Sequence, residues 1–178
     1  SSEIIYFLNQ QRSLLALQKA EKMKKQAFAD RYPYGIFSCI RTMGHIYKSR
    51  GNFDLSAQYY QEALDYMLKN MPDQDPSQLY SSLAEYYRNT QKDYATALDY
   101  CEKALKSAKT ERNIAQAMIE KCLILFRQGR IDEFNDCYKE AVQMADRCKL
   151  SANVSLLIAH IYRNILDKQY EQAHAHRS

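Results

Sequence analysis

An internal repeat of about 40 residues constrains the fold of this chain more than any other feature. A small residue recurs at intervals of 40, 38 and 37 positions, at Gly44, Ala84, Cys122 and Ala159. Three positions after each one comes an aromatic or apolar residue, at Tyr47, Tyr87, Leu125 and Tyr162. Apolar residues around them recur every three or four positions, which is the period of one helix face, and a short turn containing Gly or Asp separates two such faces. Each copy is therefore predicted to be a hairpin of two helices.

The composition of the chain excludes most other fold classes. Only 4 Gly and 3 Pro occur among its 178 residues, too few for collagen, for a turn-rich β-sandwich or for a Gly-rich phosphate loop. Apolar residues make up 46%, which is enough to build a core. This length allows one domain or a short stack of repeats. We therefore expect a single all-α domain.

Charge and hydropathy limit the classes of partner that we expect. The net charge is +4 and no stretch gathers five or more like charges, so we expect no nucleic-acid partner. The longest apolar run, from Cys122 to Phe126, is far shorter than the roughly 20 residues that span a bilayer. A membrane is expected to be involved only through segments outside this sequence.

The repeat resembles the tetratricopeptide repeat. The small, aromatic, small, aromatic and small positions of that family match Gly44, Tyr47, Ser56, Tyr60 and Ala63. The resemblance covers roughly residues 33–173, although the copies are longer than the family unit of about 34 residues and the third has Phe134 where the family prefers Ala. It implies a right-handed superhelical stack of antiparallel hairpins with about eight or nine helices.

The predicted units divide the chain 1–178 into one domain with five parts. An N-terminal helix from a partial repeat covers 1–32, three repeats cover 33–71, 76–110 and 111–149, and a truncated repeat covers 150–178. We expect both ends to be cut from a longer protein. The two prolines of Met71–Pro76 should stop one helix, and Asp75 or Ser77 should cap the next. The N-terminal helix is expected to bury a face formed by Leu8, Leu15, Ala16, Ala20, Met23 and Ala27.

Neither the cysteines nor the histidines form a pattern that indicates chemistry. The five cysteines contain no CxxC pair, so they are interpreted as small buried hydrophobes, and unpaired thiols are typical of a reducing compartment. His174 and His176 would point about 200° apart on a helix and would not share a metal ion. No sequence motif of a hydrolase, zinc protease or nucleotide-binding loop is present. We expect no enzyme activity, no metal and no cofactor.

The family resemblance implies a concave groove lined by the first helix of each hairpin. The groove residues carried over from the family are Arg41, His45, Lys48, Ser81, Glu85, Arg88, Ile119, Leu123, Phe126, Arg127, Leu156, His160 and Arg163. They suggest a basic end and an apolar end, with Ile119, Leu123 and Phe126 forming a pocket for a peptide or a partner helix. The alternative is that the superhelix tightens there, or that a terminal helix fills the groove.

Some family members bind chaperone tails through a carboxylate clamp of Lys and Asn. The corresponding groove positions here hold Arg41, His45, Ser82, Gln116 and Glu120. A clamp of that kind is therefore not expected.

The run from Gly44 to Phe53, the near-40 spacing and the Tyr-Lys/Gln-Glu-Ala endings most resemble the sensor regions of histidine kinases and related regulators in Bacteroidetes-type bacteria. That resemblance implies a non-catalytic input domain in the periplasm, which binds a peptide, a small ligand or a neighbouring protein, or forms a homodimer. The alternative is a cytoplasmic adaptor or peptide-receptor regulator that uses the same groove. The five thiols favour the alternative.

Overall fold

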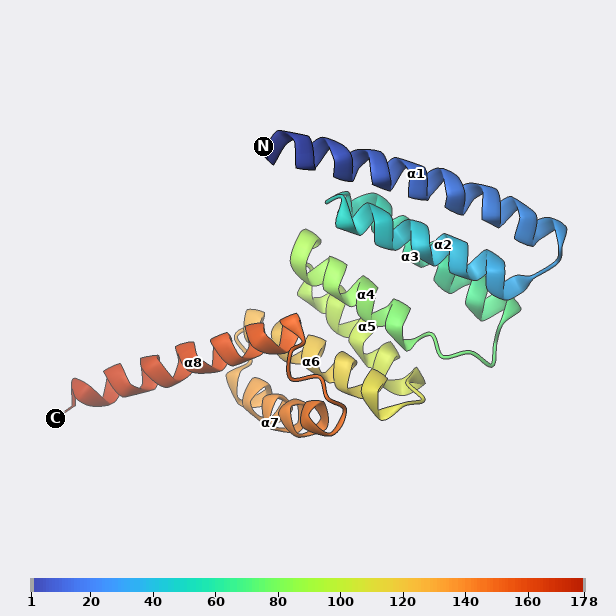
Figure 1. Ribbon diagram of the computed structural model, residues 1–178. Coiled ribbons are helices and arrows are strands. Elements are labelled where there is room, and N and C mark those ends of the chain that lie inside the picture. Colours follow the sequence, from blue (N-terminus) through green and yellow to red (C-terminus); the bar gives the residue numbers. More distant parts are fainter. Residues whose placement is uncertain (1, 178) are drawn as a thin grey trace.

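The computed structural model describes residues 2–177, and over this range the chain is a stack of helices without a β-strand (Figure 1). The α-helices are α1 (Ser2–Ala29), α2 (Pro33–Ser49), α3 (Phe53–Asn70), α4 (Ser77–Tyr86), α5 (Tyr94–Ser107), α6 (Glu111–Arg127), α7 (Ile131–Arg147) and α8 (Val154–Ala175). A π-helical turn, η1 (Tyr87–Gln91), extends α4. The predicted all-α stack of hairpins is confirmed.

Three antiparallel hairpins form the body of the molecule: α2 with α3, α4 with α5, and α6 with α7. Consecutive hairpins pack through α3 against α4 and through α5 against α6, while α4 also contacts α6 and α6 contacts α8. In Figure 1, α1 lies along α2 at one end of the stack and α8 leaves the other end as a projecting arm. The first helices of the hairpins therefore share one face of the stack.

The small residues of the repeat lie where helices cross. Ala84, Cys122 and Ala159 are at most 1% exposed. In the first hairpin the hydroxyl of Ser56 donates to the carbonyl oxygen of Gly44 over 2.7 Å. A Cβ atom on Gly44 would lie 2.7 Å from the ring of Tyr60, a distance that real Cβ contacts essentially never show. Glycine is therefore the residue that this close crossing of α2 and α3 requires.

The third hairpin accommodates a large side chain, Phe134, where the other copies have small ones. Phe134 is fully buried. Its ring packs edge-on against Phe126, with centroids 5.4 Å apart, and stacks on Tyr138 at 5.7 Å. Aromatic packing of this kind favours offset and edge-to-face geometry. Neighbouring aromatic residues thus accommodate the phenylalanine that replaces the usual small residue at this position.

Asp75 organises the turn between α3 and α4, although the predicted side-chain cap by Asp75 or Ser77 is wrong, because Pro76 is the N-cap residue of α4 and no side chain caps it. The backbone N–H of Ser77 donates to Oδ1 of Asp75 over 2.8 Å. The backbone N–H of Lys109 and the side-chain amide of Asn113 donate to Oδ2 over 2.8 and 3.1 Å. Burial acts to raise the pKa of Asp75, but these donors outweigh it and the pKa lies below its ordinary value. One carboxylate therefore joins the turn before α4 to the start of α6.

The buried face predicted for the N-terminal helix is wrong in part. Ala20 and Ala27 are buried, but the other four members are exposed: Leu8, Leu15, Ala16 and Met23. Helix α1 instead turns Leu17 against the core and places Lys24 beside Glu62 of α3, with Nζ 3.5 Å from Oε1. A lysine can lay its aliphatic stem on a core while its ammonium group reaches a carboxylate. The buried face of α1 therefore includes a charged residue that apolar patterning does not count.

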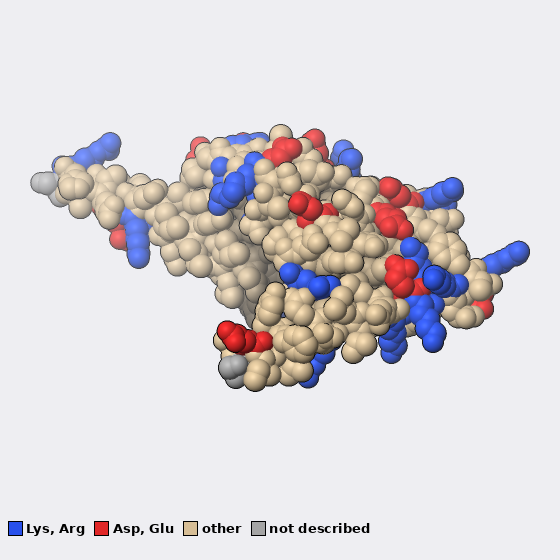
Figure 2. All heavy atoms as spheres, turned by 90° about the horizontal axis from the view of Figure 1, so that it is seen from above, with Lys and Arg blue, Asp and Glu red and all other residues tan. Residues whose placement is uncertain are grey.

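Both outer helices also expose apolar side chains. On α1 these are Ile4, Ile5, Tyr6 and Phe7, and on α8 they are Leu157, Ile161, Ile165 and Tyr170. Seen from above, charged side chains of both signs mix at the end where α1 meets α2, and few lie over the N-terminal end of α1 (Figure 2). Across residues 2–177, none of the helices combines the length and apolar character needed to cross a membrane.

Candidate binding groove

A polar cavity lies between the first helices of the successive hairpins. Its volume is about 260 Å³. It is lined from α2, α4, α6 and the start of α8 by His45, Gln78, Ser81, Ser82, Glu85, Gln116, Glu120, Asn153 and Ser155. All nine side chains are polar, and the amide and hydroxyl groups both donate and accept hydrogen bonds. The cavity therefore suits a ligand that presents donors and acceptors in alternation.

His45 is held at the edge of this cavity by Tyr60. The hydroxyl of Tyr60 lies 2.7 Å from Nδ1 of His45. Burial is the main cause that lowers the pKa of His45, and the positive charges of Arg41 and Lys48 lower it further. Burial also raises the pKa of Tyr60, so both groups are neutral near pH 7. A tyrosine hydroxyl that donates to Nδ1 leaves the imidazole proton on Nε2, where it can be donated to a ligand.

A smaller pocket of about 70 Å³ adjoins the cavity at His45, Gln78 and Ser82. Its wall combines the apolar side chains of Phe37, Met67 and Leu79 with the guanidinium of Arg41 and with Asp75, whose carboxylate already accepts hydrogen bonds from the turn and from α6. The guanidinium carbon of Arg41 stands 5.1 Å from the centroid of the Phe37 ring, as in a cation–π contact. Within the described part of the chain Arg41 forms no salt bridge. This pocket therefore presents an available positive charge.

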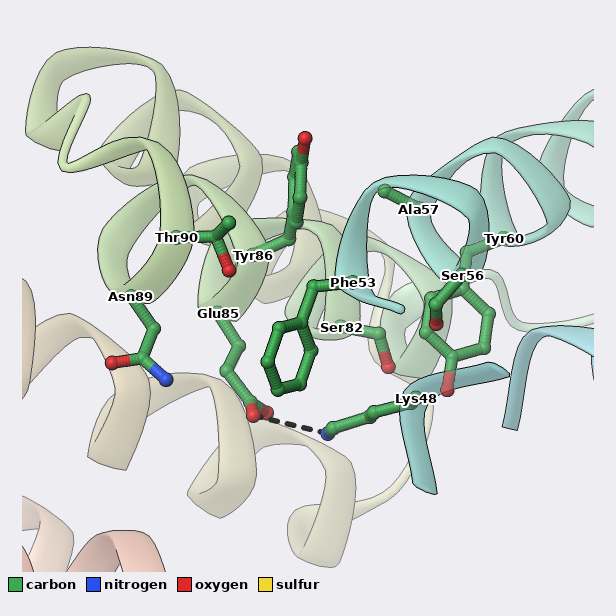
Figure 3. A pocket seen from close by; sticks show the side chains of 10 residues that line it. All are labelled: Lys48, Phe53, Ser56, Ala57, Tyr60, Ser82, Glu85, Tyr86, Asn89 and Thr90. Atoms are coloured by element: carbon green, nitrogen blue, oxygen red, sulfur yellow. Dashed lines mark ion pairs between the residues drawn. The ribbon is translucent and has the colours of Figure 1, made fainter. Parts of the chain in front are cut away.

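A third recess lies where the first hairpin meets α4 (Figure 3). Lys48 reaches Glu85 there, with Nζ 3.0 Å from Oε1, and the ring of Phe53 lies beside this ion pair. Both charged side chains are partly exposed, so the pair contributes little to stability. The recess has a volume of only about 20 Å³, enough for one water-sized group. The ion pair with Glu85 neutralises the charge of Lys48, whereas the charge of Arg41 has no such partner among the described residues.

Arg88 and Glu120 form a buried ion pair at the floor of the groove. The π-helical turn η1 carries Arg88, whose Nε donates to Oε1 of Glu120 over 2.5 Å, and the two residues are 9% and 5% exposed. Burial raises the pKa of the Glu120 carboxyl, and Arg88 opposes this rise. Removing one partner of a buried pair costs about 3–5 kcal/mol. Arg88 therefore has a structural role in this buried ion pair.

Five of the thirteen predicted groove residues line these recesses: Arg41, His45, Lys48, Ser81 and Glu85. All five come from α2 and α4. Their role in binding a partner stays a prediction.

The expectation that Ile119 and Leu123 form an exposed apolar end is wrong. They are 1% and 0% exposed, and Leu156 of the last helix is 2% exposed. The reason is that α6 contacts α4, α5, α7 and α8, so neighbours surround it. The predicted groove residue Arg88 is likewise buried, as described above. These four side chains are not accessible to a ligand.

The remaining predicted residues, Phe126, Arg127, His160 and Arg163, do not line the cavity. Phe126 stacks on Tyr162 of α8, with ring centroids 3.9 Å apart. The other three pair with side chains of α5, α7 and α8. The terminal helix α8 therefore covers this end of the groove, which was the alternative to an apolar pocket.

Sequence reasoning did not place Gln78, Asn153 or Ser155 in the groove. Gln78 lies three and seven positions before Ser81 and Glu85, so a helical projection of α4 would have included it. Asn153 and Ser155 belong to the start of the following helix and reach the cavity only because α8 packs on α6. No local signal in the sequence reports that approach.

Among residues 2–177, no group of three or more His, Cys, Asp or Glu side chains could hold a metal ion. The polar groups around the cavity are amides, hydroxyls, one imidazole and two carboxylates. One of these carboxylates, that of Glu120, is already paired with Arg88. What this arrangement can do chemically is form hydrogen bonds with a ligand.

Comparison with known proteins agrees with this geometry. Residues 37–110 match the family model of the tetratricopeptide repeat, and this range includes the hairpins α2–α3 and α4–α5 almost completely. No curated protein matches the chain. The match supports a tetratricopeptide-repeat solenoid, and repeats of this family commonly bind proteins or peptides.

Proposed function

We propose that this chain is a non-catalytic module that binds an extended peptide segment of a partner protein in the polar groove. The observation that carries the proposal is the cavity of about 260 Å³, whose nine lining side chains are all polar and come from four helices. An extended peptide offers an N–H donor and a C=O acceptor at nearly every residue. Amide and hydroxyl side chains can pair with both kinds of group.

The charges of the groove suggest how such a peptide is oriented. Arg41 presents an available guanidinium in the pocket that adjoins the cavity, whereas Lys48 is engaged by Glu85. Arg pairs with carboxylates through a planar fork of N–H donors. We therefore propose that an acidic side chain or a C-terminal carboxylate of the peptide lies at the Arg41 end.

Selection from a random peptide library displayed on phage tests this function. Peptides enriched on the wild-type chain are expected to lose affinity at least about tenfold with Ser81→Arg, because the long side chain fills the cavity and removes hydrogen bonds. Arg41→Gln should weaken the peptides that carry a carboxylate and spare those that lack one.

A matched control is Gln18→Arg, which adds the same side chain to an exposed position of α1. It should leave the affinities unchanged. Peptides that bind the Ser81→Arg variant as tightly as the wild type would show that the polar cavity is not the binding site.

We further propose that the module is the sensor or regulatory input domain of a bacterial signalling protein of the histidine-kinase type. The repeat spacing and the run from Gly44 to Phe53 support this role. In that setting the module binds its partner in the periplasm or pairs with a second copy. A cytoplasmic adaptor is the second candidate, which the five free cysteines favour.

The coding sequence around this segment separates the two candidates. A membrane-spanning segment followed by a kinase domain supports the sensor role. A helix-turn-helix domain, or a full-length protein with no membrane segment, supports the adaptor. Sedimentation velocity of the chain across a range of concentrations tests the homodimer.

A further inference from the structure

Two thiols meet inside the third hairpin. Cys122 of α6 and Cys137 of α7 have their sulfur atoms 2.9 Å apart, and the thiol of Cys122 donates to Sγ of Cys137. The thiol of Cys137 in turn lies 3.4 Å from the carbonyl oxygen of Met118. A disulfide has a sulfur–sulfur distance of about 2.0 Å, so closing this bond requires an approach of only about 0.9 Å. Rotations of the two side chains can supply such a movement.

The two sulfur atoms differ in a way that sets the order of reaction. Cys137 is 6% exposed, whereas Cys122 is fully buried. The hydrogen bond from Cys122 is the largest cause that lowers the pKa of Cys137, with help from the positive charge of Lys121 and against the effect of burial. The same hydrogen bond, together with burial, raises the pKa of Cys122. Since the thiolate is the reactive form, Cys137 is the nucleophile that a small oxidant meets first.

We propose that Cys122 and Cys137 are an oxidation site that closes to a disulfide between α6 and α7 when the protein meets a peroxide. The sulfur of Cys137 attacks one oxygen of hydrogen peroxide, the O–O bond breaks, and Cys137 sulfenic acid and water form. The sulfur of Cys122 then attacks the Cys137 sulfur and displaces its hydroxyl as a second water. In total two thiols lose two protons and two electrons, and one peroxide takes them up and is reduced to two waters.

This site is independent of the proposed peptide groove, although it lies on a helix that the groove uses. Helix α6 carries Gln116 and Glu120 to the polar cavity. A bond between positions 122 and 137 closes a short loop around the α6–α7 turn and restricts the unfolded chain. The oxidised protein should therefore hold this hairpin more firmly, whatever occupies the groove.

Peroxide treatment of the full 178-residue chain followed by tryptic peptide mapping tests the proposal. Trypsin places every cysteine on a different peptide, and the two of interest fall on Cys122–Arg127 and Ile131–Lys139. The expected result is a linked pair of these two peptides, lighter by two hydrogen atoms than their sum, that separates on reduction. Wild-type protein that keeps both thiols free for alkylation, under conditions where another cysteine is oxidised, would overturn the proposal.

Single variants distinguish the roles of the two sulfurs. Cys122→Ser keeps a hydroxyl donor toward Cys137 but cannot form the disulfide, so it should leave a sulfenic acid on Cys137 that dimedone labels, whereas Cys137→Ala should leave Cys122 unreacted. Cys101→Ala is the matched control, because Cys101 is fully buried in the neighbouring α5 and burial raises its pKa. It should form the linked pair like the wild type. Because the linked pair is first sought in the wild-type protein, the test does not depend on the variants folding.

The thermal midpoint gives a second readout. Oxidation should raise the Tm of the wild type and of Cys101→Ala, and leave that of Cys137→Ala unchanged. An equal rise in Cys137→Ala would assign the effect to another thiol and overturn the proposal.

Discussion

At Gly44 a missing side chain allows the first hairpin to close. The hydroxyl of Ser56 reaches the Gly44 carbonyl oxygen over 2.7 Å, and a Cβ on Gly44 would lie 2.7 Å from the Tyr60 ring. Gly44→Leu should therefore lower the free energy of unfolding by about 2 kcal/mol or more, because overpacking separates α2 from α3. Urea denaturation measures the change. Thr42→Leu, which adds the same side chain to an exposed position of α2, should cost far less, and equal losses in both variants would contradict the assigned crossing.

Asp75 is a second single residue on which the fold depends, and it acts through its negative charge. Its pKa is lowered because donors from Ser77, Lys109 and Asn113 outweigh the effect of burial. A carboxyl whose folded pKa is depressed stabilises the protein above its unfolded pKa, and this stabilisation is lost as the pH falls through the folded pKa. Asp75→Asn should cost about 1 kcal/mol at pH 7, after allowance for the partial exposure of the carboxylate. The difference from the wild type should shrink below about pH 4.

Denaturation of the wild type and Asp75→Asn between pH 3 and pH 7 checks this dependence. Asp73→Asn removes a neighbouring, exposed carboxylate and should show little difference at any pH in that range. If the difference in unfolding free energy between the wild type and Asp75→Asn stays constant over this pH range, the negative charge of the carboxylate is not what stabilises the turn.

At the scale of the helix, α6 shows where sequence reasoning succeeds and where it ends. The repeat correctly located the hairpins and the small residues at their crossings, because those features follow from local periodicity. The interpretation of Ile119 and Leu123 as groove residues failed, because α4, α5, α7 and α8 together surround α6 and bury these side chains. Likewise, the partly buried Lys24 of α1 pairs with Glu62 of α3, 38 positions later in the chain. A local sequence pattern does not predict contacts between segments that lie far apart in the chain.

The stacking of Phe126 on Tyr162 makes α8 depend on α6. Phe126→Asp places a charge where two rings are 3.9 Å apart, and it should cost about 2 kcal/mol because a partly buried aromatic contact is replaced by a charge without a partner. Faster hydrogen exchange is expected in α8, with α2 and α3 unchanged. Phe28→Asp alters an exposed phenylalanine of α1 and should not affect α8. Unchanged exchange in α8 after Phe126→Asp would show that other contacts hold this helix.

At the scale of the whole molecule, the stack is held together by contacts between neighbours. Each hairpin contacts the next, and α1 and α8 each have a packed neighbour on one side while exposing apolar side chains on the other. In such a solenoid, stability is approximately a sum of unit and interface contributions, so the ends open at a lower free energy than the middle. Hydrogen exchange should therefore be slowest in α4–α6 and fastest in the outer halves of α1 and α8.

Two identical substitutions at different places test this gradient. Leu83→Ala removes a fully packed side chain from α4, in the middle of the stack, and should cost about 2–5 kcal/mol. Because both neighbouring hairpins rest on α4, exchange should accelerate throughout the molecule. Leu17→Ala removes a partly buried side chain from α1, so it should accelerate exchange in α1 while α4–α7 keep the wild-type rates. If Leu17→Ala accelerates exchange everywhere, the chain unfolds as one cooperative unit and nearest-neighbour contacts do not govern its stability.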